Sequence, residues 1–181
     1  PQSTFAPTDV HFVSSVYYYA SAAYVAKAAE VLELPEKAAY EQLASHIRSA
    51  ILEEYFTPTG RLAIDTQTAY LLALRFGLCP DKEKAIAAFQ NRFKKDCRHL
   101  TGGFVGATMM NTVLADNGMA DIAYDLLCYE GFPGWLYAVN LGATTIWERW
   151  NSVLPDGTVS GTGMNSLNHY SYGAVPEFLY R

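Results

Sequence analysis

The sequence predicts an all-α protein, built as an arc of antiparallel helix pairs like those of a double-layered toroid. Segments of helical length follow one another along the chain, separated by turns rich in Gly and Pro. In three successive pairs, a helix that is apolar on nearly every face precedes a helix with one apolar stripe. Helices enclosed on all sides need apolar residues all round, whereas outer helices need them on one side only.

The first predicted pair covers the N-terminal third of the chain. Residues 9–34 carry few charges and are apolar or aromatic on most faces, with Thr8 or Asp9 as the expected N-cap. Pro35 opens the second helix, which we expect to extend to residue 56. Its charges lie away from its apolar stripe, so it should be an outer helix.

Two further pairs repeat this contrast. Asp65 is expected to cap an almost uncharged helix over 66–77, and the two-faced segment 81–97 follows it. The segment 103–118 is again nearly uncharged, and 119–130 carries acidic residues along one side. The order of inner and outer helices is therefore the same in all three pairs.

The last part of the chain differs from the rest in composition. After Phe132 it holds all three Trp residues and several Gly, which indicates loops of the kind that carry functional sites. One more inner helix is expected after Asn165. Residues 1–181 are then a single domain of three to four hairpins, an incomplete ring whose open edge exposes apolar helices and favours self-association.

Composition and charge exclude several functions. The formal net charge is -5, with 13 Lys and Arg against 18 Asp and Glu, so nucleic acid is not an expected partner. No apolar run is long enough for a membrane span, and the first residues lack the pattern of a secretory signal, which favours a cytoplasmic location for the chain as given. The three cysteines, Cys79, Cys97 and Cys128, are interpreted as reduced core thiols, with neither a disulfide framework nor a zinc site.

Aromatic residues make up 14% of the chain, more than a small core needs. Such a surplus suits a pocket for a ligand with apolar faces and polar edges, such as a sugar. A Tyr-rich interface between helices explains the same composition equally well.

Glu148 is the strongest candidate for catalysis. It lies in TIWERW between Trp147 and Trp150, and glycosidases use a carboxylate among indoles as the acid or base beside a stacked sugar ring. The alternative is a structural ion pair of Glu148 with Arg149 or Arg181.

Six further residues are candidates for sugar binding, among them Trp147 and Trp150 on either side of Glu148. His169 is either a ligand contact or a hydrogen-bonded core residue, and Trp135 is either a stacking platform or a packed indole. Asn165 and Asn168 could both face a ligand, although capping of the last helix suits Asn165 better. The sequence contains no phosphate-binding loop, nucleophile elbow or HExxH motif, and we expect no metal and no cofactor.

These residues stand in strings that resemble one family. GATTIWERWNS at 142–152, MNSLNHYSYGAV at 164–175 and the preceding GGFVGA, DIAYDLL and FPGWLY are similar to the C-terminal part of the catalytic toroid of bacterial α-L-rhamnosidases. The resemblance covers nearly the whole chain in the same order.

The resemblance implies a six-hairpin (α/α)6 fold and hydrolysis of terminal α-L-rhamnosides with inversion. It makes Glu148 the general base that activates water and His169 a contact to the bound sugar. Inverting glycosidases place base and acid about 6.5 to 9.5 Å apart to admit that water. The acidic motif that holds the family's general acid does not occur in this chain. We therefore expect a fragment with only the base side of the site, inactive alone, whose partners are rhamnosides and the remainder of the parent domain.

Two other functions remain open. A noncatalytic carbohydrate-binding or pseudoenzyme module would use the same Trp, Asn and His residues. A helical scaffold would instead bind a protein through its open apolar edge.

Overall fold

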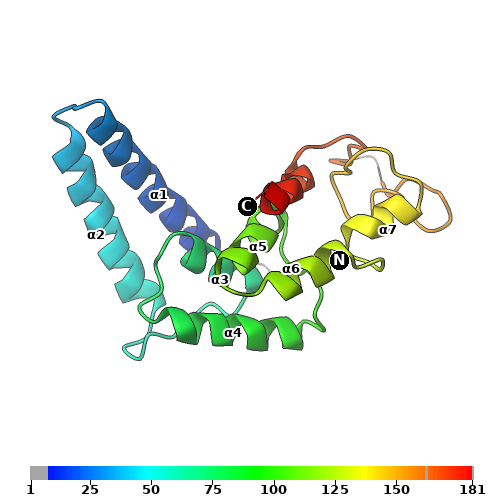
Figure 1. Cartoon of the computed structure of the whole chain (residues 1–181), viewed down its shortest axis with the longest axis horizontal. Coiled ribbons are helices and arrows are strands. Elements are labelled where there is room, and N and C mark those ends of the chain that lie inside the picture. The colour runs from blue at the N-terminus through cyan, green and yellow to red at the C-terminus, as the bar shows by residue number, and fades with distance from the viewer. Residues whose placement is uncertain (1–7, 162, 181) are drawn as a thin grey trace. The chain divides into compact units, whose positions relative to one another are not determined.

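A computed structural model describes residues 8–161 and 163–180. Its helices are α1 (Val10–Val31), α2 (Lys37–Tyr55), α3 (Gln67–Arg75), α4 (Lys82–Lys95), α5 (Phe104–Asp116), α6 (Ala120–Leu127), α7 (Trp135–Asn140) and the 3-10 helix η1 (Ser171–Tyr180) (Figure 1). The described residues contain no strand beyond two isolated antiparallel bridges. The predicted all-α class is confirmed.

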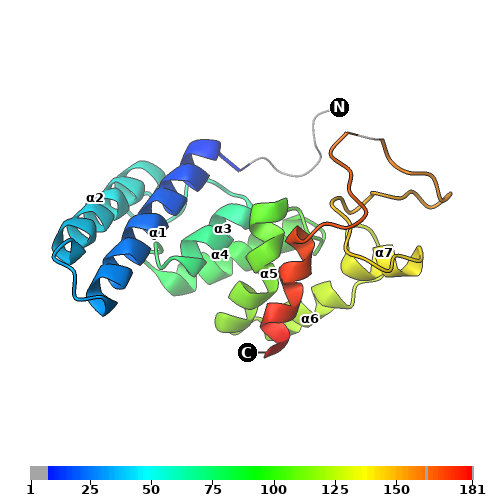
Figure 2. The ribbon, with the colours of Figure 1, turned by 90° about the horizontal axis from the view of Figure 1, so that it is seen from above.

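The chain divides into two compact units, residues 1–92 and 93–181, with the boundary inside α4. In the first unit, α1 and α2 lie side by side as an antiparallel hairpin (Figures 1 and 2). Asp9 is the N-cap of α1, because its carboxylate accepts the backbone N–H of Phe12 at 2.8 Å. The Phe12 ring then packs edge-on against Tyr55 of α2, with the ring centroids 5.0 Å apart.

The first helix buries only one of its apolar faces within this chain. Its buried side consists mainly of small residues facing α2 and α3, whereas Tyr18 is 56% exposed, Tyr24 62% and Val25 42%. The expectation of an all-round buried helix is therefore met for only part of α1. These side chains form an exposed apolar surface on α1.

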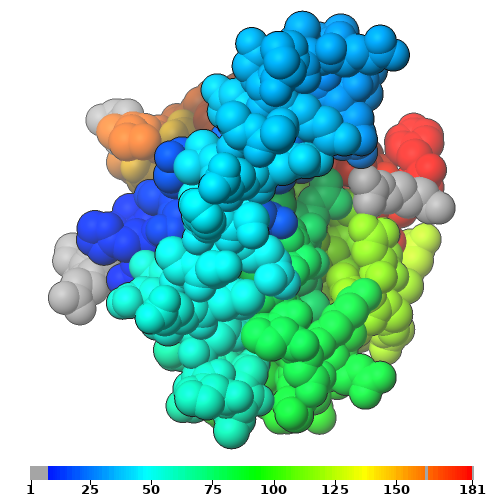
Figure 3. Space-filling model, turned by 90° about the vertical axis from the view of Figure 1, so that its left-hand side faces the viewer, coloured from blue at the N-terminus to red at the C-terminus, as the bar shows by residue number. Residues whose placement is uncertain are grey.

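The second helix has the two-faced character that its sequence predicts. Ala44 and Ile51 are buried, whereas most of its charged residues face solvent. This exposed side of α2 is toward the viewer in Figure 3, in sky blue to cyan.

The third helix is capped by a residue other than the expected one. Thr66, not Asp65, adopts the extended N-cap conformation, and its hydroxyl accepts the N–H of Ala69 at 3.3 Å. Asp65 instead accepts the Tyr70 hydroxyl at 3.1 Å and lies 3.5 Å from the Arg92 guanidinium. All residues from Gln67 to Ala73 are buried, as predicted for an inner helix.

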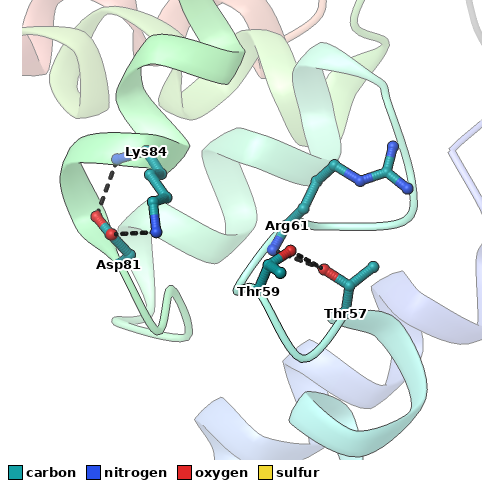
Figure 4. Close-up of polar contacts among 5 residues, drawn as sticks. All are labelled: Thr57, Thr59, Arg61, Asp81 and Lys84. Atoms are coloured by element: carbon teal, nitrogen blue, oxygen red, sulfur yellow. Dashed lines mark hydrogen bonds and ion pairs between the residues drawn. The ribbon is translucent and has the colours of Figure 1, made fainter.

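Short-range polar contacts fix the turns on either side of α3 (Figure 4). Between α2 and α3, the Thr57 hydroxyl accepts the N–H of Arg61 at 3.1 Å and lies 3.0 Å from the Thr59 hydroxyl. At the start of α4, the Asp81 carboxylate accepts the N–H of Lys84 at 3.0 Å and pairs with its ammonium at 3.1 Å. These contacts fix the turn that follows α2 and the start of α4.

In the second unit, α5 packs against both α6 and η1 (Figure 2). The Asn111 amide of α5 donates to the carbonyl oxygen of Ala123 in α6 at 2.8 Å. The expected helix after Asn165 begins only at Ser171 and is of the 3-10 type, with Pro176 inside it. Pro removes a backbone donor and so disfavours a regular α-helix there.

Two further expectations need correction. Residues 135–140, expected to be loop, form the short helix α7. The cysteines are free, but Cys97 and Cys128 are exposed rather than in the core, and only Cys79 is partly buried. None of the helices in the described part of the chain is long and apolar enough to cross a membrane.

Candidate active site

The two strings singled out in the sequence lie side by side in the second unit. The N–H of Glu148 donates to the carbonyl oxygen of Ser166 at 2.9 Å, and the N–H of His169 donates to that of Ile146 at 2.7 Å. The Thr145 hydroxyl adds a third link, to the carbonyl oxygen of Leu167. The first two of these bonds join backbone groups at both ends, and together the three hold Glu148 and His169 on neighbouring segments.

The Glu148 carboxylate is oriented by a backbone donor. Its Oε2 atom accepts the N–H of Ser166 at 2.7 Å, and the residue is half-buried. Within residues 8–161 and 163–180, no side chain forms an ion pair with Glu148 and no group donates to Oε1. A carboxylate with one oxygen held and the other open can accept a proton from water.

The alternative interpretation of Glu148 as an ion-pair partner of Arg149 is wrong. The Arg149 guanidinium instead donates to the carbonyl oxygen of Gly163. It therefore holds the loop segment that precedes Ser166 in the chain. Arg181, the other suggested partner, lies outside the described residues.

His169 stands in an aromatic environment. Its ring stacks on Phe104 at the start of α5, with centroids 5.2 Å apart and planes 13° apart, and on Tyr170 at 5.0 Å. Its Nδ1 atom accepts the N–H of Ser171 at 3.3 Å. In the neutral imidazole the proton is then on Nε2, which leaves Nε2–H as a donor for a ligand oxygen.

Trp135 and Trp150 form a packed cluster with Tyr172. Trp150 stacks on Tyr172, with centroids 3.9 Å apart, and meets Trp135 edge-on at 5.1 Å. The Trp135 indole donates to the carbonyl oxygen of Tyr172 at 2.9 Å. Burial raises the pKa of Tyr172 to about 12, so its phenol is neutral at ordinary pH.

A small hollow lies among these rings. Its volume is about 30 Å³, and its lining includes Trp135, Trp147, Trp150 and Tyr172. In the described part of the chain, the indole N–H of Trp150 is buried without an acceptor.

The two asparagines differ in their surroundings. The Asn165 amide nitrogen lies within hydrogen-bonding distance of three backbone carbonyl oxygens, those of Ser152, Ser160 and Gly161. It does not cap η1, which starts six residues later in the chain. Asn168 is exposed, and its backbone forms a tight turn with the Ser166 hydroxyl.

Sequence reasoning missed three contributors to this site. Ser166 holds the carboxylate through its backbone N–H, which leaves no mark in the sequence. Phe104 and Tyr172 support His169 and Trp150, and neither was singled out, because an aromatic residue near a helix start is equally typical of a core. Among the residues that the structure describes, no three His, Cys, Asp or Glu side chains are grouped to hold a metal ion.

Similarity to known proteins shows the family of this chain. The profile of the bacterial alpha-L-rhamnosidase six-hairpin glycosidase domain matches residues 1–181. The chain belongs to this family. Its predicted fold, helix pairs of the six-hairpin glycosidase type, is confirmed by the same match and by the solved structures below.

Members of the family from two bacteria are similar in sequence. An alpha-L-rhamnosidase of Streptomyces avermitilis is 41% identical over 147 residues, which is 80% of this chain and 14% of that protein. One from Formosa agariphila is 42% identical over 149 residues, 80% of this chain and 16% of that protein. The chain therefore spans only about a sixth of the length of these family members.

Two solved structures share its fold. The crystal structure of the Streptomyces avermitilis alpha-L-rhamnosidase complexed with L-rhamnose superposes with a TM-score of 0.87 at 38% identity, covering 93% of this chain and 16% of that one. The native alpha-L-rhamnosidase from Aspergillus terreus gives a TM-score of 0.91 at 29% identity, covering 98% of this chain and 22% of that one.

Proposed function

We propose that this chain supplies the base side of the active site of an α-L-rhamnosidase, which hydrolyses terminal α-L-rhamnosides with inversion. The observation that carries the proposal is the Glu148 carboxylate, held at Oε2 by the Ser166 N–H and open at Oε1. The names of the similar proteins and the rhamnose bound in one of them supply the substrate class.

In this mechanism Oε1 of Glu148 accepts a proton from a water molecule as the water oxygen attacks the anomeric carbon of rhamnose. The bond from that carbon to the leaving oxygen breaks on the opposite face, so the configuration inverts. A carboxylic acid protonates the leaving oxygen. We place this acid outside residues 1–181, because the family's acidic motif does not occur among them.

His169 has a matching role in binding. With Nδ1 occupied by the Ser171 N–H, Nε2–H can donate to a sugar hydroxyl while the stacked Phe104 ring keeps the imidazole in place. We assign Trp147 to the wall of the site. Trp135 and Trp150 support it through their contacts with Tyr172.

The test uses Glu148→Gln in the complete gene product that contains residues 1–181. The amide keeps the shape of the side chain but cannot accept the proton, so we expect turnover of an aryl α-L-rhamnoside to fall by about 10²- to 10⁴-fold. Binding of L-rhamnose, measured by calorimetry, should change little. Glu130→Gln, an exposed carboxylate beyond α6, is the matched control and should keep full activity.

Two results would contradict the proposal. Substantial turnover by Glu148→Gln would remove the base assignment. Rhamnose binding without any turnover by the unmutated protein would favour the noncatalytic carbohydrate-binding module instead.

A further inference from the structure

We propose that Asn165 is a positioning residue for the general base, acting through the loop that presents the Ser166 N–H to Glu148. This inference rests on the proposed function and deepens it. It gives Asn165 a role different from both the sugar contact and the helix cap that its sequence position allows.

The contacts of the Asn165 side chain are all directed at its own loop. Its Nδ2 atom lies 3.2 Å from the carbonyl oxygen of Ser152, 2.9 Å from that of Ser160 and 3.1 Å from that of Gly161. Three acceptors around one terminal atom identify that atom as the nitrogen, since the amide oxygen would be repelled by them. Both amide hydrogens are thus used within the loop and are not available to a sugar.

These three carbonyls come from two parts of the chain that must stay together. Ser152 is the last residue of the GATTIWERWNS string, and its hydroxyl accepts the Arg149 N–H at 3.1 Å. Ser160 and Gly161 begin the return toward Asn165, and the N–H of Ser160 donates to the carbonyl oxygen of Ser152 at 2.9 Å. The Asn165 amide therefore joins the two sides of this loop, the one at Ser152 and the one at 160–161, immediately before Ser166.

The next residue in the chain makes the contact that matters for catalysis. The Ser166 N–H reaches Glu148 Oε2 at 2.7 Å, and the Ser166 carbonyl oxygen accepts the Glu148 N–H at 2.9 Å. A fixed Asn165 leaves the Ser166 peptide little freedom, so the carboxylate is held in one orientation. Loss of the Asn165 amide frees that peptide, and a base misplaced by about 1 Å can lose about 100-fold in rate.

The experiment measures Asn165→Ala in the complete gene product, with an aryl α-L-rhamnoside as substrate. We expect kcat to fall by about 10- to 100-fold with KM nearly unchanged, because the loop acts on the base and not on the sugar. Calorimetric titration with L-rhamnose counts the folded sites, and its stoichiometry should stay at that of the unmutated protein. Asn140→Ala, an exposed asparagine at the end of α7, is the matched control and should keep its kcat within about twofold.

A second pair of variants separates a role through Glu148 from a general structural role. In Glu148→Ala, azide can replace the activated water as nucleophile, and there is no carboxylate left to position. Adding Asn165→Ala to that variant should then change the azide-dependent rate by less than about twofold. An equal loss in both backgrounds, or a drop in the number of rhamnose sites that matches the loss of kcat, would overturn the inference.

Failure of the proposed function would be seen in a different variant: Glu148→Gln would retain turnover. If Asn165→Ala does not fold, Asn165→Ser keeps one donor for the loop and carries the same comparison. Its kcat should lie between those of the alanine variant and the unmutated protein, and an unchanged kcat would overturn the inference.

Discussion

Glu148 and His169 owe their placement to backbone bonds between segments that are separate in the sequence. Both residues could be singled out from the sequence, because a carboxylate between indoles and a histidine beside Asn and Tyr are chemically unusual. The groups that hold them in place could not be predicted from the sequence. The groups that hold them are the N–H of Ser166 and the N–H of Ser171, and any non-proline residue supplies a backbone N–H.

The sugar-binding role proposed for His169 makes a prediction. His169→Ala removes the Nε2–H donor, and one hydrogen bond is worth about 1 kcal/mol, so KM for an aryl rhamnoside should rise by about 5- to 10-fold. Steady-state kinetics of the complete gene product measure this. His46→Ala, on the exposed side of α2, is the control, and unchanged KM and kcat in His169→Ala would reassign His169 to structure.

At the level of the helices, the sequence predicted which helices are buried and which are exposed on one side. It predicted the residues at which helices begin less well. Helix α3 is buried from Gln67 to Ala73 and α2 is exposed on one side, as their charge patterns predict. The cap of α3 was assigned one residue too early. Asp and Thr are both good N-caps, and the choice depends on the contact of Asp65 with Tyr70, which sequence spacing does not reveal.

The corrected cap can be tested on the stability of α3. Thr66→Ala removes the acceptor for the Ala69 N–H and should cost about 1 kcal/mol, which speeds hydrogen exchange of the first α3 amides about fivefold. Thr66→Ser keeps the acceptor and should exchange like the unmutated protein. If Asp65→Ala speeds this exchange and Thr66→Ala does not, Asp65 is the cap after all.

For the chain as a whole, alternation of helix types was enough to predict an all-α fold of hairpins. The 3-10 form of η1 and the short α7 were not predicted, because Pro176 and the Gly-rich context dominate over weak periodicity there. The exposed Tyr18, Tyr24 and Val25 on α1 indicate a surface that α2 and α3 leave uncovered. The chain also spans only 14% and 16% of two family members, so its chemistry has to be measured in the complete gene product.

The most direct test of the base assignment is the azide product of Glu148→Ala. The substrate is 4-nitrophenyl α-L-rhamnoside, whose leaving group, 4-nitrophenolate, departs without needing an acid. The small alanine side chain leaves room for azide, which attacks the anomeric carbon as the leaving group departs. NMR of the product should reveal β-L-rhamnosyl azide, formed at a rate that rises with azide concentration. Azide that neither restores release of nitrophenolate nor appears in the product, or an α-linked azide, would contradict the role of Glu148 as the base of an inverting enzyme.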